Sequence, residues 1–141
     1  MARSGPIIII EDDYDDQEII HDILKELEVP NNIIFFTNGS DGLKYLKTTN
    51  EQPFLIICDV NLPGINGLEF KKQIDNDSYL RQKSIPFVFL TTSASRDAVN
   101  KAFTEMIVQG FFEKSSSLSE LKQMLKTIIE YWKISKNPNT A

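Results

Sequence analysis

Five polar residues follow short apolar runs, and their side chains suit metal and phosphate chemistry. The run "PIIII" is followed by the carboxylates of Glu11 and Asp12, and the run "FLIIC" is followed by Asp59. The run "FVFL" leads to the hydroxyl of Thr91, and "GFFE" leads to the ammonium of Lys114. Carboxylates bind hard cations, and a lysine ammonium suits a phosphoryl oxygen. The five residues are therefore candidates for one site, provided that the fold brings them together.

The apolar runs have the composition and spacing of strands in a parallel sheet. They cover residues 6–11, 32–37, 54–59, 85–91 and 110–114. Each run is short and almost continuously apolar, which is typical of strands that are covered on both faces. Segments with helical spacing of apolar residues separate the runs. Strand and helix therefore alternate five times, which predicts an α/β fold with a doubly wound parallel sheet and helices on both faces.

Such a sheet binds ligands in the crevice beyond the carboxyl ends of its strands. Glu11 and Asp12 occupy that end of the first predicted strand, and Asp59 occupies that end of the third. Three carboxylates in one crevice repel one another, and either protonation or a hard cation relieves this repulsion. We expect a divalent metal ion to bind there.

Capping residues mark several predicted helix starts. Ser95 precedes the helical segment "RDAVNKAF", and "SLSE" at 117–120 has the pattern of a capping box. Asp13, Asp15 and Asp16 follow the acidic pair, where carboxylates cap a helix and suit its positive end. We interpret these three acids as mostly structural.

Length and composition indicate one globular domain. The chain has 141 residues, of which 41% are hydrophobic and 25% are charged. Its 20 acidic and 15 basic residues give a net charge of -5, which argues against direct binding of nucleic acid. We place the domain at 6–134 and expect 1–5 and 135–141 to be flexible ends.

The sequence also predicts a cytoplasmic location. The single cysteine, Cys58, lies inside an apolar run, which excludes an internal disulfide and indicates a reducing environment. Neither an export signal nor an apolar stretch long enough for a membrane span is expected.

Four segments resemble the motifs of the receiver domain of two-component response regulators: "IIIIEDD", "IICDVNLPGINGLEF", "FVFLTTSAS" and "GFFEKSSS". The resemblance spans roughly residues 6–134 and implies a five-stranded flavodoxin-like fold with strand order 2-1-3-4-5. By motif position it implies that Asp59 is the phosphoacceptor and that Glu11 and Asp12 are the acidic pair. It likewise implies that Thr91 is the switch hydroxyl, whose loop has to move inward to reach the phosphate, and that Lys114 is the essential lysine.

The resemblance further implies a Mg²⁺ site and a switch aromatic. Asp12, Asp59 and the backbone carbonyl of Asn61 would hold the ion, and Glu11 would act through a water molecule. Phe111 stands where the family carries its switch aromatic. The implied function is a stand-alone signalling switch that catalyses only its own phosphorylation and dephosphorylation, and is otherwise not an enzyme.

The phosphodonor has to be supplied by a partner. His21 is the only histidine and falls within the first predicted helix, so the chain cannot provide the donor itself. We expect the partner to be a histidine kinase or a histidine phosphotransfer protein. Since 135–141 leave no room for an output domain, output is expected through docking to another protein, through a homodimer, or by passing the phosphoryl group on.

Three other functional classes fit the motifs less well than a phosphorylation switch. A phosphohydrolase with an aspartyl nucleophile usually has a general acid two residues later, where this chain has Asn61. A nucleotide-binding module would show GxxxxGK[ST] or GxGxxG, and neither occurs. An EF-hand is excluded because "EDDYDD" lacks the glycine and the distal glutamate.

Two local features lead to further expectations. Ser115 stands where the family usually has a proline after the lysine, so we predict a trans Lys114–Ser115 peptide with the ammonium still directed at Asp59. Several hydrophobic side chains suit either the core or a contact surface, and we expect about two thirds of them to be core. They are Phe103, Phe111, Phe112, Tyr131, Trp132 and Ile134.

Overall fold

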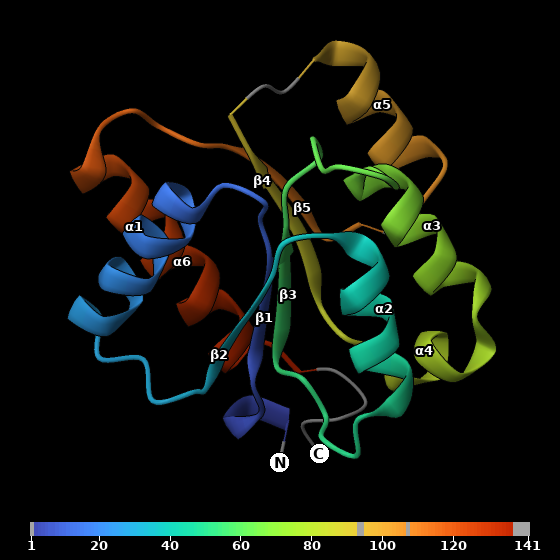
Figure 1. Ribbon diagram of the computed structural model, residues 1–141. Coiled ribbons are helices and arrows are strands. Elements are labelled where there is room, and N and C mark those ends of the chain that lie inside the picture. The colour runs from blue at the N-terminus through green and yellow to red at the C-terminus, as the bar shows by residue number, and fades with distance from the viewer. Residues whose placement is uncertain (1, 93–94, 107, 137–141) are drawn as a thin grey trace.

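The computed structural model describes residues 2–92, 95–106 and 108–136. Its strands form one parallel sheet in the order β2-β1-β3-β4-β5 (Figure 1). This confirms the predicted doubly wound sheet and its strand order, and each strand lies within the run predicted for it. The strands are β1 (Ile7–Ile10), β2 (Ile33–Phe36), β3 (Leu55–Cys58), β4 (Phe87–Thr91) and β5 (Gly110–Glu113).

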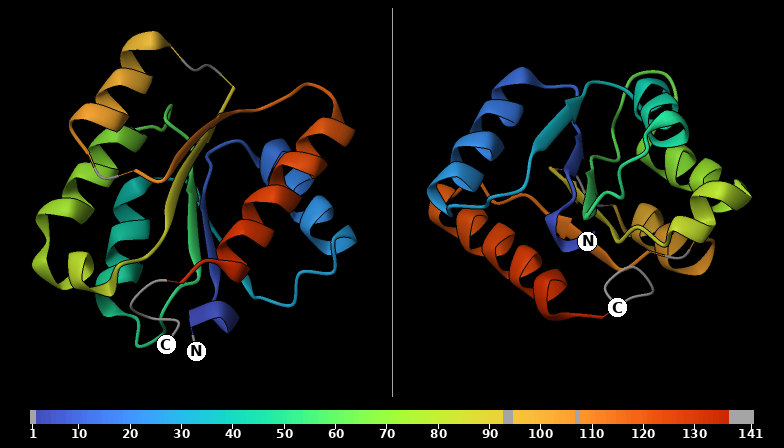
Figure 2. Two further views of the ribbon diagram at one scale, coloured as in Figure 1. Left: turned by 180° about the vertical axis from the view of Figure 1, so that it is seen from behind. Right: turned by 90° about the horizontal axis from the view of Figure 1, so that it is seen from below.

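Helices cover both faces of the sheet, as predicted. On one face lie α1 (Tyr14–Glu26) and α6 (Leu118–Ile134), which Figure 2 shows side by side. The other face is covered by the helices between β2 and β5 (Figure 1). They are α2 (Gly39–Thr48), α3 (Gly67–Asn76), α4 (Ser78–Lys83) and α5 (Arg96–Thr104). A short 3-10 helix, η1 (Ala2–Ser4), precedes β1.

The connection from β3 to β4 differs from the simple alternation of strand and helix. It contains two helices, because Asp77 has an extended backbone that ends α3. The side chain of Asp77 then accepts a hydrogen bond from the backbone N–H of Leu80 and so caps α4. The regular 1:1 alternation predicted from the sequence is therefore wrong at this point.

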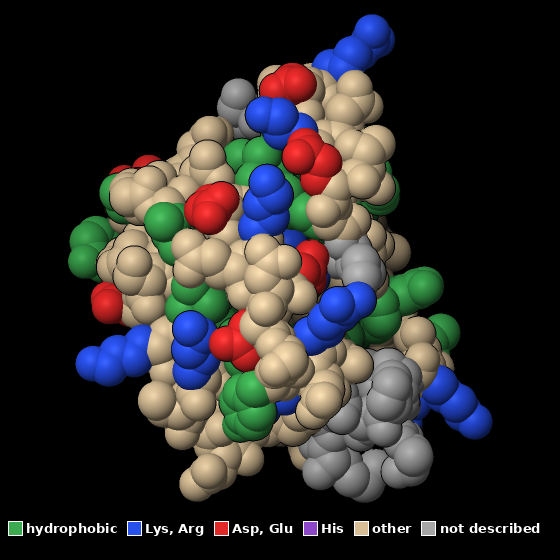
Figure 3. Space-filling model, turned by 90° about the vertical axis from the view of Figure 1, so that its right-hand side faces the viewer, with side chains coloured by type: hydrophobic (Ala, Val, Ile, Leu, Met, Phe, Trp, Pro, Cys, Tyr) green, Lys and Arg blue, Asp and Glu red, His purple; other side chains and the backbone are tan. Residues whose placement is uncertain are grey.

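The surface over α3, α4 and α5 is mixed in charge. Figure 3 shows Lys and Arg side chains interspersed with Asp and Glu on this side. Two exposed pairs there are Lys72 with Glu105 at 3.9 Å and Lys101 with Asp97 at 3.6 Å. Pairs of this kind contribute little to stability, since water screens both charges.

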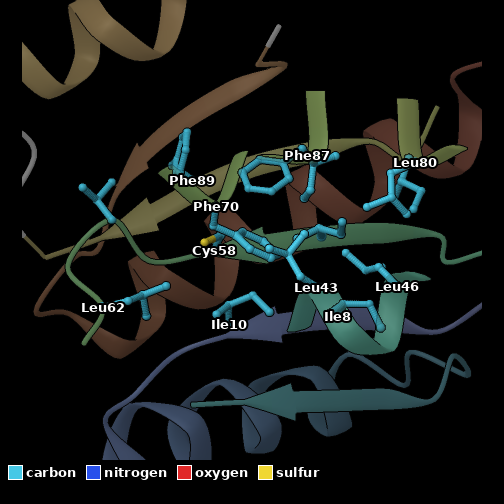
Figure 4. Packing of buried hydrophobic residues seen from close by; sticks show 14 of the residues in the cluster. Ile8, Ile10, Leu43, Leu46, Cys58, Leu62, Phe70, Leu80, Phe87 and Phe89 are labelled. Carbon is cyan, nitrogen blue, oxygen red and sulfur yellow. The ribbon is translucent and has the colours of Figure 1, made fainter. Parts of the chain in front are cut away.

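Two hydrophobic clusters flank the sheet, because successive strand residues point to opposite faces. The cluster under α2 to α5 contains Ile8, Ile10, Cys58, Phe87 and Phe89 from the strands, and Figure 4 shows how they pack against the helices. The cluster under α1 and α6 takes the alternate residues, such as Ile7, Ile9, Ile57, Val88 and Leu90. Burial raises the pKa of Cys58 well above its usual value, so this thiol stays protonated.

Most of the expected helix caps are present. Asp13 caps α1 by accepting hydrogen bonds from the backbone N–H groups of Asp15 and Asp16, and Ser95 caps α5. Ser117 caps α6, but its capping box is not reciprocal. The Glu120 carboxylate instead accepts a bond of 2.6 Å from the Ser115 hydroxyl, which in turn accepts the backbone N–H of Ser117 at 3.1 Å.

The expectation that two thirds of the six ambiguous hydrophobic residues are core is wrong. Phe111, Phe112 and Trp132 are partly buried against the core, whereas Phe103, Tyr131 and Ile134 are exposed. The reason in α6 is helical geometry. Its buried stripe runs through Leu121, Leu125, Ile128 and Ile129, and at ~100° per residue Ile134 falls on the opposite side.

Side-chain contacts join the start of the chain to other segments. The Asn31 side-chain amide donates hydrogen bonds to the carbonyl oxygens of Arg3 and Gly5, and Arg3 donates one to the carbonyl of Ser135. Residues 1 and 137–141 lie outside the described residues, so the flexibility of 1–5 and 135–141 stays a prediction. Within the described part of the chain, every helix is too short or too polar to span a bilayer.

Candidate functional site

The carboxyl ends of β1, β3, β4 and β5 bring the predicted site residues together. Glu11 follows β1, Asp59 follows β3, Thr91 ends β4, and Lys114 comes directly after β5. Strand register aligns these ends, since Ile10 pairs with Cys58 and Thr91 pairs with Glu113. The parallel sheet thus places residues up to 103 positions apart within bonding distance.

The Asp59 carboxylate is buried and held in a fixed position. Its Oδ1 accepts a hydrogen bond of 2.8 Å from the Thr91 hydroxyl and one of 3.0 Å from the backbone N–H of Asn61. Its Oδ2 lies 3.5 Å from the Lys114 ammonium. A carboxylate that is held by a hydroxyl on one side and an ammonium on the other has its oxygens positioned to act as a nucleophile.

Lys114 is surrounded by carboxylates. Its side chain is 6% exposed and contacts Glu11 Oε1, Asp16 Oδ2 at 3.1 Å and Asp59 Oδ2 at 3.5 Å. The described residues contain no cis peptide bond, so the Lys114–Ser115 peptide is trans while the ammonium faces Asp59. Both parts of that prediction are confirmed in this structure.

Burial and charge shift the pKa values of this pair. Burial raises the pKa of Glu11 to about 7, although the hydrogen bond and the positive charge of Lys114 oppose the shift. Burial alone would lower the pKa of Lys114. Its hydrogen bond to Glu11 and the charges of Glu11 and Asp59 outweigh burial, so the pKa of Lys114 is raised and the ammonium stays charged.

The carboxylates form a group that suits a hard cation. One oxygen each from Glu11, Asp12 and Asp59 lies within 4.8 Å of the others. Oxygen donors without histidine or thiolate neighbours favour Mg²⁺ or Ca²⁺ over softer metals. Both oxygens of Glu11 are already engaged, by Lys114 and by the backbone N–H of Asp13. The Asp12 carboxylate is exposed and, among the described residues, forms no hydrogen bond or ion pair, so it is free to ligate.

Comparison with known proteins decides the family. A family model described as "Response regulator receiver domain" matches residues 7–126. The chain belongs to the receiver domain family of response regulators. Response regulator Rcp1 of Synechocystis sp. is 30% identical over 131 residues, covering 89% of this chain and 87% of Rcp1. Chemotaxis protein CheY-3 of Vibrio cholerae is 28% identical over 131 residues, covering 92% of this chain and 95% of CheY-3.

Solved structures agree with this receiver fold. The phosphorylated cyanobacterial phytochrome response regulator RcpA has a TM-score of 0.83 at 30% identity, with coverage of 94% of this chain and 96% of RcpA. The Mn²⁺-bound form of Rcp1 has a TM-score of 0.79 at 28% identity and the same coverage of both chains. That neighbour binds a divalent metal ion, and the oxygen cluster of Glu11, Asp12 and Asp59 in this chain has the ligand chemistry for one.

The structure places the two predicted switch residues of the receiver domain on the neighbouring strands β4 and β5. Thr91 is fully buried and its hydroxyl bonds to the Asp59 carboxylate, whereas the predicted inward movement concerns a bond to a phosphoryl oxygen. Phe111 pairs across the sheet with Phe89 rather than with Thr91. Its ring packs on that of Phe89 at a centroid distance of 5.4 Å and is already turned toward the core. Their part in switching stays a prediction.

Two contributors to the receiver site were not predicted. Asp16, assigned above to the helix start, pairs with Lys114, because Asp13 caps α1 and Asp16 faces the crevice from the first turn of the helix. Gly67, the first residue of α3, packs against the backbone of Asp59, where an added Cβ would clash with the Asp59 carbonyl oxygen. The signal for Asp16 in the sequence was an acid beyond the one needed to cap α1. The signal for Gly67 was the "NG" at 66–67, where α3 begins.

Proposed function

We propose that this receiver domain takes a phosphoryl group onto Asp59 from a phosphohistidine of a partner protein and signals through the resulting change in shape. The observation that carries the proposal is the environment of Asp59. Its carboxylate is fixed by Thr91 and Asn61 and faces Lys114 inside an acidic cluster. This arrangement supplies a nucleophile for the phosphorus atom, and a hydroxyl and an ammonium for two of the outer oxygens of the phosphoryl group.

The transfer is a displacement at phosphorus. An oxygen of Asp59 forms a bond to phosphorus while the P–N bond of the phosphohistidine breaks, and the electron pair returns to the imidazole of the partner. Lys114 then binds one phosphoryl oxygen, and the Thr91 hydroxyl binds another. Asp12, Asp59 and the Asn61 carbonyl would hold Mg²⁺, which offsets the negative charge that gathers on the phosphoryl oxygens.

The place of His21 supports a donor from outside the chain. This side chain is half-exposed on α1, 3.6 Å from Asp22, with its ring facing that of Phe35 on β2. It is the only histidine of the chain and belongs to none of the contacts around Asp59. A histidine kinase or a histidine phosphotransfer protein is the proposed donor, and the proposed setting is the cytoplasm.

The experiment that tests this function separates a switch from a hydrolase. The protein with Mg²⁺ is mixed with a phosphorylated histidine phosphotransfer protein, and separately with excess p-nitrophenyl phosphate. We expect at most one phosphoryl group per chain from the first donor and no sustained nitrophenol release from the second. Sustained release at many turnovers per chain, lost in Asp59→Asn, would replace the proposal with a phosphohydrolase. Asn61, which offers only an amide at the usual general-acid position, argues against that outcome.

A further inference from the structure

A second hollow lies at the end of the sheet opposite Asp59. Its volume is about 360 Å³, and it is lined by α3, α4, the residues that precede β4 and β5, and Trp132 of α6. This size is within the range of small-molecule sites. Its position beside Pro86 and Gln109, at the amino ends of β4 and β5, separates it from the carboxylate crevice.

A buried lysine stands in the wall of this hollow. Lys71 is 4% exposed and lies on the face of α3 that otherwise buries Phe70 and Ile74. Its ammonium donates a 2.7 Å hydrogen bond to Asp75 and lies 5.0 Å from the centre of the Phe87 ring. An ammonium has three donors, and burying them without acceptors is costly. Asp75, which also lines the hollow, accepts one of them, and no further acceptor for this ammonium lies among the described residues.

Arg81 adds a second positive charge at the rim. Its side chain is exposed and, within the described ranges, makes no ion pair or hydrogen bond. Among the described residues that line the hollow, Lys71 and Arg81 carry two positive charges and Asp75 carries one negative charge, so this wall has a net positive charge. The rest of the wall is largely apolar, with contributions from Ile74, Leu80, Ile85, Pro86 and Trp132.

We propose that this hollow binds a small organic carboxylate that has an apolar body. The carboxylate would accept hydrogen bonds from Lys71 and from the guanidinium of Arg81, whose planar fork matches two carboxylate oxygens. The apolar body would pack against Pro86 and Trp132. Asp75 would continue to hold Lys71 in place through its own hydrogen bond.

Trp132 makes the proposal directly measurable, because it is the only tryptophan of the chain. The probe is 3-phenylpropanoate, added to the full-length protein while tryptophan fluorescence is excited selectively. We expect a saturable change with a dissociation constant on the order of 1 mM. The neutral analogue 3-phenylpropanamide, which keeps the apolar body, should bind at least about tenfold more weakly, since it lacks the charge-assisted bonds.

Variants decide which groups are responsible. Lys71→Met and Arg81→Gln should each weaken 3-phenylpropanoate binding by about tenfold. Lys72→Met is the matched control, because Lys72 is half-exposed on the same helix and pairs with Glu105. A neighbouring hollow of about 260 Å³ also contains Trp132 but is lined by Thr127 rather than Lys71, so Thr127→Glu should leave the affinity unchanged.

Arg81→Gln is at the surface and keeps the test valid if Lys71→Met does not fold. The proposal is overturned if acid and amide bind equally or if Arg81→Gln has wild-type affinity. It is also overturned if Thr127→Glu alone abolishes binding, or if neither fluorescence nor chemical-shift mapping of Lys71 and Trp132 detects saturable binding.

Discussion

The two buried lysines of this domain have equally hidden side chains and very different surroundings. The side chains of Lys114 and Lys71 are each 6% exposed. Lys71 pairs with Asp75, one helical turn further along α3. Lys114 pairs with Glu11, Asp16 and Asp59, which are 103, 98 and 55 positions away in the sequence. The first pair needs only a helix, whereas the second group exists only when the whole sheet has formed.

The two groups also differ in charge balance. Lys71 and Asp75 cancel one another, but Lys114 faces three carboxylates, and Asp12 adds a fourth nearby. An excess of buried negative charge is unfavourable unless a cation or a proton compensates it. The crevice is therefore sensitive to what binds there, since a metal ion or a phosphoryl group changes which carboxylate Lys114 prefers. The Lys71 pair has no such excess.

Removing each ammonium should separate the two regions most clearly. We expect Lys114→Met to lower the free energy of unfolding by about 3 kcal/mol in EDTA, because it leaves buried carboxylates without a cation. Lys71→Met should cost only about 1 kcal/mol, since Asp75 is partly exposed and water can solvate it. Urea unfolding at neutral pH measures both values, and equal losses would mean that the two environments do not differ as described.

A second comparison concerns metal binding by neighbouring acids. Asp12→Ala should weaken Mg²⁺ binding by at least about tenfold, since it removes a direct ligand from an ion that tolerates poor geometry badly. Asp13→Ala should leave Mg²⁺ binding nearly unchanged and instead cost about 1 kcal/mol of stability through the lost helix cap. Calorimetric titration with Mg²⁺ tests this. If both variants bind equally weakly, the acidic pair has been placed one residue out of register.

Phosphorylation should affect the segment from the end of β4 to β5 and spare α4. With beryllium fluoride and Mg²⁺ as a phosphoryl mimic, we expect hydrogen exchange to slow from Thr91 to Phe112, because Thr91 and Phe89 share one face of β4 and Phe111 packs on Phe89. Exchange in α4 should stay the same. A change confined to residues 11–16 would remove the support for Thr91 and Phe111 as switch residues.

The smallest effect is expected at Ser115. Its hydroxyl bonds to Glu120 and accepts the backbone N–H of Ser117, so Ser115→Ala should lower the free energy of unfolding by about 1 kcal/mol. The ammonium of Lys114 does not depend on these bonds, and phosphorylation should keep its wild-type rate. Thermal unfolding and acetyl phosphate labelling provide the two measurements. A large loss of labelling would show that this loop also positions Lys114.

The sheet and the main site residues were predictable, because both follow from strong local patterns. Continuous apolar runs such as "PIIII" identify strands, and the residue after each run falls in the crevice of a parallel sheet. Glu11, Asp59, Thr91 and Lys114 meet there for this reason.

Features that depend on exact packing were not predictable. The backbone at Asp77 divides one expected helix into two, although the polar stretch at 75–78 contains neither Gly nor Pro, the strongest helix breakers. The pairing of Asp16 with Lys114 depends on how α1 is rotated, and the close approach of Gly67 to Asp59 depends on the loop between β3 and α3. The inward position of Thr91 is likewise a property of the packed state and not of the motif.

Labelling of Asp59 tests the central claim most directly. Wild-type protein and Asp59→Asn are incubated with acetyl phosphate and Mg²⁺, and the intact mass and the modified peptide are determined for each. The variant keeps the size of the side chain and removes its negative charge. We expect wild-type protein to gain a single phosphoryl group on the peptide that contains Asp59, and the variant to gain none. Equal labelling of Asp59→Asn, or a wild-type phosphoryl group on another residue, would contradict the assignment of Asp59 as the phosphoacceptor.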